Sequence, residues 1–281
     1  MTTHIMVNKT YRLLTKIGEG SFSKIFRAQH KDTGHQVAIK LVKAAHHAIY
    51  ENELAMYAKL AEKTHIPSLF AAGIEGPYFF LAIDLYDQNL EQLRASFGAM
   101  PLKVVLQLGL QMLTIIESLH QKGVLHRDIK PANFMLKTNA QNISELFLID
   151  LGLAGCFKDV NQKHIQMKTD ERLMGTPRYM SVNTHQRLTS SRRDDLESLG
   201  YILVYLHKGE LPWQGLNADG GGGDGGGELA LSIKQSFGWA YANSMLGEFI
   251  LFIQYCRNLK FAEEPHYDYL RTLLTNLAKI I

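Results

Sequence analysis

The stretch that decides the fold of this chain is His126-Arg127-Asp128-Ile129-Lys130-Pro131-Ala132-Asn133, together with Asp150-Leu151-Gly152. Phosphoryl transfer demands little covalent chemistry from a protein, but it requires groups that position the acceptor and neutralise phosphate oxygens. Any one of these residues alone would be an ordinary loop residue, so the prediction of a phosphoryl-transfer site rests on their order and spacing. The predicted roles are positioning of the acceptor hydroxyl by Asp128, contact with the γ-phosphate by Lys130, and metal binding by Asn133 and Asp150.

The amino-terminal part of the chain predicts a nucleotide site to match. Residues 11–17 and 24–30 have the character of strands, and between them lies the turn Gly18-Glu19-Gly20-Ser21-Phe22-Ser23. Glycines let backbone amides approach phosphate closely. However, Ser23 stands where the motif usually has a third glycine, and two glycines between strands are also typical of an ordinary hairpin. The turn alone therefore does not distinguish a phosphate-binding loop from a hairpin, and its interpretation depends on the motif that follows it.

Residues 37–40, Val-Ala-Ile-Lys, match a third-strand motif whose lysine reaches the α- and β-phosphates of a nucleotide. Lys40 then needs an acidic partner on the next helix, which we expect at residues 46–60. Glu51 and Glu53 are the two candidates. We favour Glu53, because Glu51 is also explained as a first-turn acid that favours the helix dipole.

The pattern of the chain changes near residue 85. Residues 78–84 predict a buried strand, and residues 85–89 lack periodicity, as a connection would. Residues 102–122 carry apolar side chains at helical spacing over a wide arc, which predicts a buried core helix. Further helices are expected at residues 196–206, 243–258 and 267–281, and a short apolar strand at residues 146–149. We therefore predict an α+β fold of two lobes, a β-rich one of residues 1–85 and a helical one of residues 86–281.

Composition and charge are ordinary for a globular enzyme inside the cell. A chain of 281 residues with a hydrophobic fraction of 46% is large enough for two lobes with separate cores. The net charge of +3 gives no basis for predicting nucleic-acid or membrane binding. Two distant cysteines indicate reduced thiols, and neither a signal segment nor an apolar run that could cross a bilayer is expected. We expect a monomer, cytoplasmic or nuclear, that binds neither nucleic acid nor membrane.

Four segments of the carboxyl-terminal part have a distinctive character. They are residues 175–185 (GTPRYMSVNTH), 191–201 (SRRDDLESLGY), 211–215 (LPWQG) and 255–259 (YCRNL). With these segments the chain resembles the casein kinase 1 family of protein serine/threonine kinases, in which Ser-Val/Ile-Asn replaces the more common Ala-Pro-Glu. The resemblance runs from about residue 11 to the carboxyl end. It implies the bilobal protein kinase fold, ATP and Mg²⁺ as cofactors, and protein substrates phosphorylated on serine or threonine near acidic or phosphorylated residues.

The resemblance also implies which residues contact the nucleotide. Ile83 aligns with the residue that guards the pocket behind adenine, and Leu85 with the residue that exchanges backbone hydrogen bonds with the base. The complete predicted set is Ile17, Gly18, Glu19, Gly20, Ser21, Ser23, Ile25, Ala38, Lys40, Ile83, Asp84, Leu85, Leu136 and Ile149.

For the substrate, the resemblance implies sites for anions. Arg178 with the backbone near Gly215 resembles one family site, and Arg127 with Arg172 resembles part of another; guanidinium groups suit phosphate because they donate paired hydrogen bonds. The alternative is structural, since Arg127 can tie the loop of Asp128 to the segment that follows, and the other arginines can pair with local carboxylates.

Two departures from the family weaken the preference for phosphorylated substrates. Residues 219–228 form an acidic, glycine-rich segment, interpreted as a flexible linker, where the family usually has lysines. Gly155 likewise stands where the family often has lysine. The glycine run is either a natural insertion or an engineered loop. Two alternatives to an active protein kinase stay open: a nucleotide-binding scaffold without phosphate transfer, and a phosphotransferase for small molecules.

Overall fold

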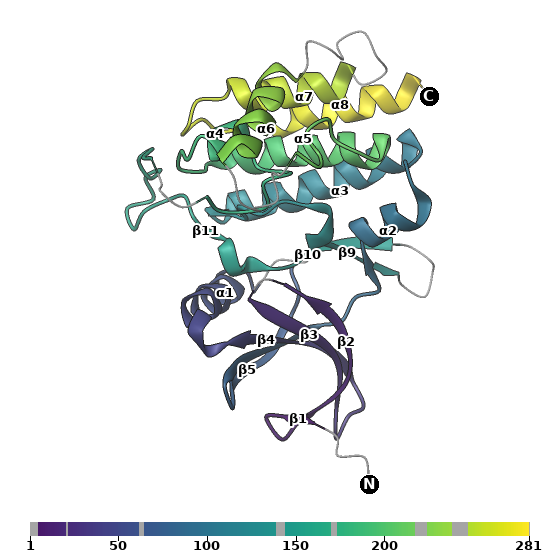
Figure 1. Ribbon diagram of the computed structural model, residues 1–281, viewed down its shortest axis with the longest axis vertical. Coiled ribbons are helices and arrows are strands. Elements are labelled where there is room, and N and C mark those ends of the chain that lie inside the picture. The colour runs from purple at the N-terminus through teal and green to yellow at the C-terminus, as the bar shows by residue number, and fades with distance from the viewer. Residues whose placement is uncertain are drawn as a thin grey trace. The chain divides into compact units, whose positions relative to one another are not determined.

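The computed structural model describes residues 5–20, 22–61, 65–138, 144–169, 173–216, 224–237 and 247–280. The chain forms two compact units, each made of two segments. The first unit comprises Met1–Asp87 and Met135–Gly152, and the second comprises Gln88–Phe134 and Leu153–Ile281. The strands of the large sheet belong to the first unit and most helices to the second (Figure 1), so the predicted α+β fold class is confirmed.

The first unit is built on an antiparallel sheet of six strands in the order β1-β2-β3-β4-β6-β5. The strands are β1 (Met6–Val7), β2 (Tyr11–Glu19), β3 (Ser23–His30), β4 (Gln36–Lys43), β5 (Leu69–Glu75) and β6 (Tyr78–Asp84). Alternating apolar residues on one face of the sheet form a core that includes Tyr11, Val37, Ile39 and Phe80. The 3₁₀ turn η1 (Ala44–His46) and helix α1 (His47–Leu60) follow β4, and α1 lies beside the sheet (Figure 1).

The first unit also contains a segment that the predicted division at residue 85 assigned to the helical lobe. Strands β9 (Phe134–Thr138) and β10 (Ser144–Leu148) pair with each other. The Leu148 N–H donates to the His65 carbonyl at 2.9 Å, and the ring of Phe147 stacks on Tyr86 at 4.7 Å. These contacts join residues distant in sequence, so no local pattern announces them.

The second unit is helical. Its helices are α2 (Leu90–Phe97), α3 (Leu102–Gln121), α4 (Val182–His185), α5 (Arg192–Lys208), α6 (Asp224–Ser236), α7 (Gly247–Asn258) and α8 (Tyr267–Ile280). The short elements are β7 (Gln88–Asn89), β8 (Val124–Leu125), β11 (Gly155–Cys156) and the 3₁₀ turn η2 (Pro131–Asn133), and a further turn, η3 (Leu151–Leu153), spans the point where the two units are divided. Strand β11 pairs with β8 in antiparallel register.

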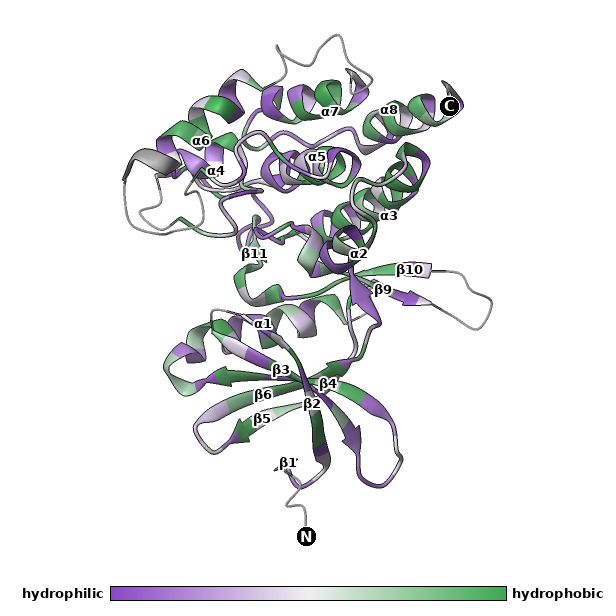
Figure 2. Cartoon of the chain, turned by 45° about the vertical axis from the view of Figure 1, so that its right-hand side comes forward, coloured by the Kyte–Doolittle hydropathy of each residue, from purple (hydrophilic) through white to green (hydrophobic). Residues whose placement is uncertain are grey.

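Helix α3 is the core helix that the sequence predicts. Among the described residues it is the one helix long and apolar enough to cross a membrane, but most of its apolar residues are buried and it packs against α5 and α8. Figure 2 shows its predominantly hydrophobic residues in green. Two glycines allow close packing: a Cβ on Gly109 would lie 2.7 Å from Leu203, and one on Gly200 would lie 2.5 Å from Ile253. Burial within the unit therefore accounts for the apolar character of α3.

Helix α5 differs from its prediction at its start, and α2, α4 and α6 had not been predicted. Helix α5 begins four residues earlier than expected, because Ser191 and Asp194 form a capping box at its start. Helix α6 was not predicted, and its first residues fall within the segment interpreted as a flexible linker, so that interpretation is wrong from Asp224 onward. Helix formation there follows tertiary packing rather than propensity, since Ala230 and Lys234 are completely buried.

Candidate active site

In the first unit, Lys40 on β4 lies between two carboxylates. Its Nζ is 2.9 and 2.7 Å from the two oxygens of Glu53 on α1, and 2.7 Å from Asp150 Oδ1. Glu51, the other candidate partner, is exposed. Burial opposes the charge of Lys40, but the carboxylates of Glu53 and Asp150 outweigh burial and raise the pKa of the ammonium. Lys40 is therefore a fixed cation, held in one orientation by a buried ion pair.

Asp150 is held by its own chain geometry and by α1. Its backbone has φ of 66°, in the left-handed region. The Asn52 side-chain amide on α1 donates to the carbonyls of Leu151 at 3.4 Å and Gly152 at 3.0 Å. The Asp150 side chain is 43% exposed although one of its oxygens contacts Lys40. It is therefore positioned to offer carboxylate oxygen outward.

All described residues of the predicted nucleotide set lie in the first unit. Gly18 pairs with Ile25 across the β2–β3 hairpin, and the Gly20 N–H donates to the Ser23 carbonyl at 2.9 Å. Ser21 lies outside the described residues. The predicted adenine side is apolar: Ala38 on β4 pairs with Ile83 on β6, and both are buried. Ile17 lies near the end of β2, Glu19 is its last residue, and Asp84 is the last residue of β6. The remaining three predicted residues are partly or fully buried: Leu85, Leu136 and Ile149.

In the second unit, the predicted catalytic loop surrounds Asp128. Lys130 Nζ lies 2.6 Å from Asp128 Oδ2, and the Thr176 hydroxyl donates to Asp128 Oδ1 at 2.7 Å. Lys130 also donates to that hydroxyl at 3.1 Å. The Asn133 side-chain amide donates to the backbone carbonyl of Asp128 at 2.9 Å. Lys130, Asn133 and Thr176 thus fix the Asp128 carboxylate, which is 8% exposed.

The loop itself is anchored by Asp195 on α5. The backbone N–H groups of His126 and Arg127 donate to its two oxygens at 2.8 and 2.9 Å, and His120 Nε2 lies 3.1 Å away. Burial opposes ionisation of Asp195, but His120, the charge of His126 and the backbone donor outweigh it and lower the pKa of the carboxyl. An ionised carboxylate therefore holds Arg127 in its left-handed conformation, φ 66°, directly before Asp128.

The predicted anion-site residues have different surroundings. The Arg127 guanidinium packs on Gly155, where a Cβ would lie 2.5 Å from Nη1. The Arg178 carbonyl accepts from Trp213 Nε1 at 2.7 Å, which places that arginine's backbone beside the segment that leads to Gly215. Gly215 has φ of 81° and open space where a Cβ would be. Arg172 lies outside the described residues.

Asn133 in the second unit and Asp150 in the first each carry an oxygen of the kind that magnesium prefers. Asn133 uses its amide nitrogen on Asp128, which leaves its oxygen as the atom it offers, and Asp150 offers carboxylate oxygen. The described residues hold no group of three or more histidine, cysteine or carboxylate side chains that could bind a metal unaided. Magnesium is usually bound by one or two protein side chains together with substrate phosphates, so this donor chemistry fits it.

A comparison with family models places the chain in a family. The protein kinase domain matches residues 11–265, which is most of the chain. The chain belongs to the protein kinase family. The kinase fold implies ATP as phosphate donor, proteins as substrates and usually a divalent metal.

Three residues in this arrangement were not predicted. Thr176 occurs in a segment quoted for its family character, without a role, and its contact with Asp128 depends on a fold that joins residues 48 positions apart. Asp195 is likewise part of a family segment, yet its backbone partners lie almost 70 residues earlier. Lys234, considered below, follows the glycine run and matches no motif.

Proposed function

We propose that this kinase is a serine/threonine kinase of the casein kinase 1 type, which uses magnesium and ATP and phosphorylates proteins near acidic or phosphorylated residues. The observation that carries this proposal is the arrangement around Asp128, whose two oxygens are held by Lys130 and Thr176. A fixed carboxylate next to a cation suits the positioning of an alcohol for attack on phosphorus.

The chain's own residues divide the work. Asp128 orients the acceptor hydroxyl and accepts its proton as the new oxygen–phosphorus bond forms, while the bond from the γ-phosphorus to the β–γ bridging oxygen breaks and ADP leaves. Lys130 stabilises the negative charge of the transferred group, and Lys40 fixes the α- and β-phosphates. Magnesium, held by Asp150 and Asn133 when bound, supplies neutralisation of the phosphate oxygens.

The family-specific segments support the casein kinase 1 assignment, because two of them contact each other. Ser181 caps α4 and donates to Asp194 Oδ1 at 2.6 Å, and the Asn183 amide lies 3.3 Å from the same oxygen. Asp194 belongs to the Arg-Arg-Asp-Asp segment at the start of α5. The Ser-Val-Asn triplet therefore has a defined partner, which gives a physical reason for these two segments to occur together.

The preference for acidic or primed substrates rests on arginines. Arg178 and the turn at Gly215 are linked through Trp213, and Arg127 contributes a guanidinium over Gly155. The family lysine at position 155 is absent, and a side chain there would collide with Arg127. We therefore propose that priming contributes less to substrate binding here than lysine-bearing anion sites would allow.

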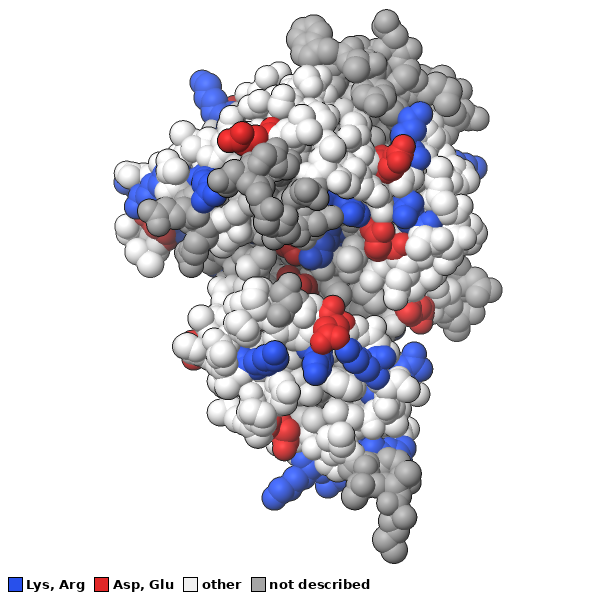
Figure 3. Space-filling view, in the orientation of Figure 1, with Lys and Arg blue, Asp and Glu red and all other residues white. Residues whose placement is uncertain are grey.

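The proposal also covers the cellular state: a monomer in the cytoplasm or nucleus that binds neither nucleic acid nor membrane. On the face drawn in Figure 3, basic and acidic side chains of the described residues are both visible, and several basic ones lie in a row across the lower part of the view. Sedimentation of the purified kinase with and without a DNA duplex tests the monomeric state and the absence of nucleic-acid binding.

The deciding experiment compares two peptides that differ at one position. One carries phosphoserine three residues before the acceptor serine, and the other carries alanine there; Asp150→Asn provides the blank. Transfer to both with a preference for the phosphorylated peptide supports the whole proposal. Equal transfer retains the serine/threonine kinase and removes the primed specificity. Transfer to neither peptide, with magnesium-ATP binding intact, favours the scaffold alternative instead.

A further inference from the structure

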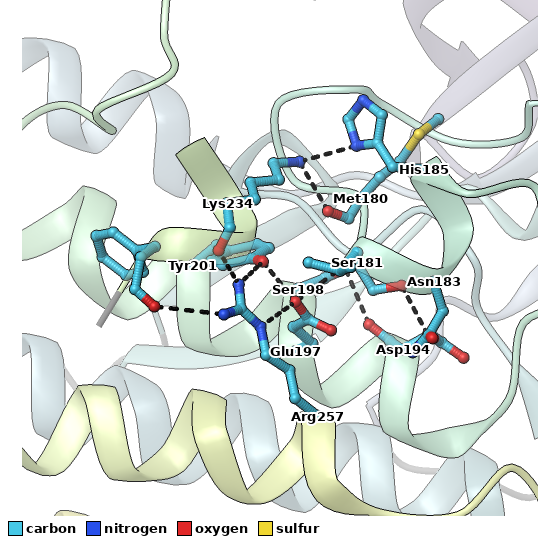
Figure 4. A network of polar contacts seen from close by, with 12 residues as sticks. Met180, Ser181, Asn183, His185, Asp194, Glu197, Ser198, Tyr201, Lys234 and Arg257 are labelled. Atoms are coloured by element: carbon cyan, nitrogen blue, oxygen red, sulfur yellow. Dashed lines mark hydrogen bonds and ion pairs between the residues drawn. The ribbon is translucent and has the colours of Figure 1, made fainter. Parts of the chain in front are cut away.

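Lys234 is a completely buried lysine in the second unit that none of the steps above uses. It lies on α6, and its Nζ donates to the backbone carbonyls of Pro177 and Met180, each at 2.8 Å. The same nitrogen lies 3.3 Å from His185 Nδ1. Figure 4 shows the lysine reaching Met180 and His185. An ammonium group has three donors, so these three acceptors match it fully.

Burying this charge is costly, since the acceptors that contact the ammonium among the described residues are two backbone carbonyls and an imidazole nitrogen rather than a carboxylate. Burial lowers the pKa of Lys234 to about 7, although the charge of Glu197 opposes this. The rings of Tyr201 and Trp213, whose centroids are 5.3 and 5.2 Å away, offset part of the cost by cation–π attraction. A methionine would fill the same space at no such cost, so the donors of Lys234 need an explanation beyond packing.

The segment that Lys234 holds lies next to the catalytic loop. Pro177 directly follows Thr176, the residue whose hydroxyl contacts both Asp128 and Lys130. Trp213 Nε1 donates a hydrogen bond to the Arg178 carbonyl in the same segment at 2.7 Å. Three carbonyls of residues 177–180 are therefore bound by two side chains that are 35 to 57 positions away in sequence.

The backbone of Lys234 is hydrogen-bonded to the helical core of the second unit. Its backbone carbonyl accepts from Arg257 Nη2 at 2.6 Å, and Arg257 Nε pairs with Glu197 at 2.9 Å (Figure 4). Glu197 lies on α5 and Arg257 on α7, two helices that pack closely together. The contacts thus form an unbroken connection from the core of the unit, through Lys234, to the backbone beside Asp128.

We propose that Lys234 is a positioning residue for the protein substrate: it holds residues 177–180 in the conformation that receives the polypeptide bearing the acceptor hydroxyl. The inference rests on the phosphotransfer function proposed above. It assigns Lys234 no contact with ATP, because the donors of its ammonium group are taken by the Pro177 and Met180 carbonyls and by His185. Loss of its donors should therefore weaken binding of the peptide and leave binding of ATP unchanged.

The test is a comparison of Michaelis constants. Lys234→Met keeps the approximate volume and removes all three donors, and Lys208→Met makes the same change at an exposed lysine near the end of α5. We expect the KM for an acceptor peptide to rise about tenfold or more in Lys234→Met, the scale of one hydrogen bond to a charged group. The KM for ATP should stay within about twofold, and Lys208→Met should match the parent in both constants.

A second variant covers the case in which Lys234→Met does not fold. Trp213→Phe keeps an aromatic ring but removes the donor to the Arg178 carbonyl together with part of a buried ring, so it should raise the peptide KM in the same direction by a smaller factor. Unchanged peptide KM in the folded variants, or equal changes in both constants, overturns the inference while the kinase assignment stands. A parent enzyme that phosphorylates no peptide overturns the proposed function and the inference with it.

Discussion

The buried ion pair of Lys40 and Glu53 yields a prediction in which stability and catalysis separate. Glu53 is 1% exposed and Lys40 is 6% exposed, with 2.7 Å between their charged atoms. At that distance, the Coulomb attraction is about 6 kcal/mol for an effective dielectric constant of roughly 20. Lys40→Met removes this attraction and leaves a carboxylate buried without its partner. Breaking a buried pair in this way costs about 3–5 kcal/mol.

Differential scanning fluorimetry measures the effect. For a chain of this size, a loss of about 3–5 kcal/mol corresponds to a fall in Tm of roughly 6–15 °C. Lys43→Met, an exposed lysine on the same strand, is the control and should change Tm little. The double variant Lys40→Met with Glu53→Leu should recover most of the loss, because an apolar pair of similar volume often replaces a buried ion pair without cost. Both Lys40 variants should transfer no phosphate.

The pH dependence supplies an independent check. Burial already raises the pKa of Glu53, and removal of Lys40 takes away the main charge that opposes this rise. A carboxyl whose pKa is raised in the folded state stabilises the fold below its unfolded pKa and loses that contribution as the pH rises through the folded pKa. The Tm deficit of Lys40→Met should therefore shrink as the pH falls from 7 to 5. A Tm equal to the parent, or a double variant no more stable than Lys40→Met, would refute the argument from the buried charge.

Three further predictions concern the second unit. Gly200→Ala should lower Tm by an amount equivalent to roughly 1–3 kcal/mol, because its Cβ would lie 2.5 Å from Ile253; an unchanged Tm contradicts the close packing of α5 on α7. Gly155→Ala should displace the Arg127 guanidinium and raise the KM for the phosphoserine peptide about tenfold, with the alanine peptide as control. Burial, aided by the Lys234 charge, lowers the pKa of His185 to about 4 from an ordinary 6.5, so the parent should lose stability as the pH falls between these values. The variant His185→Gln should show a shallower loss over that range, and an identical slope in both proteins would exclude the histidine as its cause.

The sequence by itself determined the chemistry of the site. The spacing of Asp128, Lys130 and Asn133 follows from one short loop, and Lys40 follows from a strand motif, so each could be recognised without knowledge of the fold. The long core helix was equally readable, because periodic apolar residues over 20 positions reflect burial directly. Each of these features depends on residues that are close together in the sequence, so each can be predicted from the sequence alone.

Only the tertiary structure decided which distant residues support that chemistry. Glu53 rather than Glu51 faces Lys40, Asp195 holds the loop before Asp128, and α6 forms next to a glycine run despite its low helix propensity. Each outcome depends on contacts between segments separated by more than ten residues, where burial and charge pairing outweigh local preference. Lys234 shows this most clearly: as a single lysine in the sequence it predicts a solvated side chain, and only the fold places it under the backbone of residues 177–180.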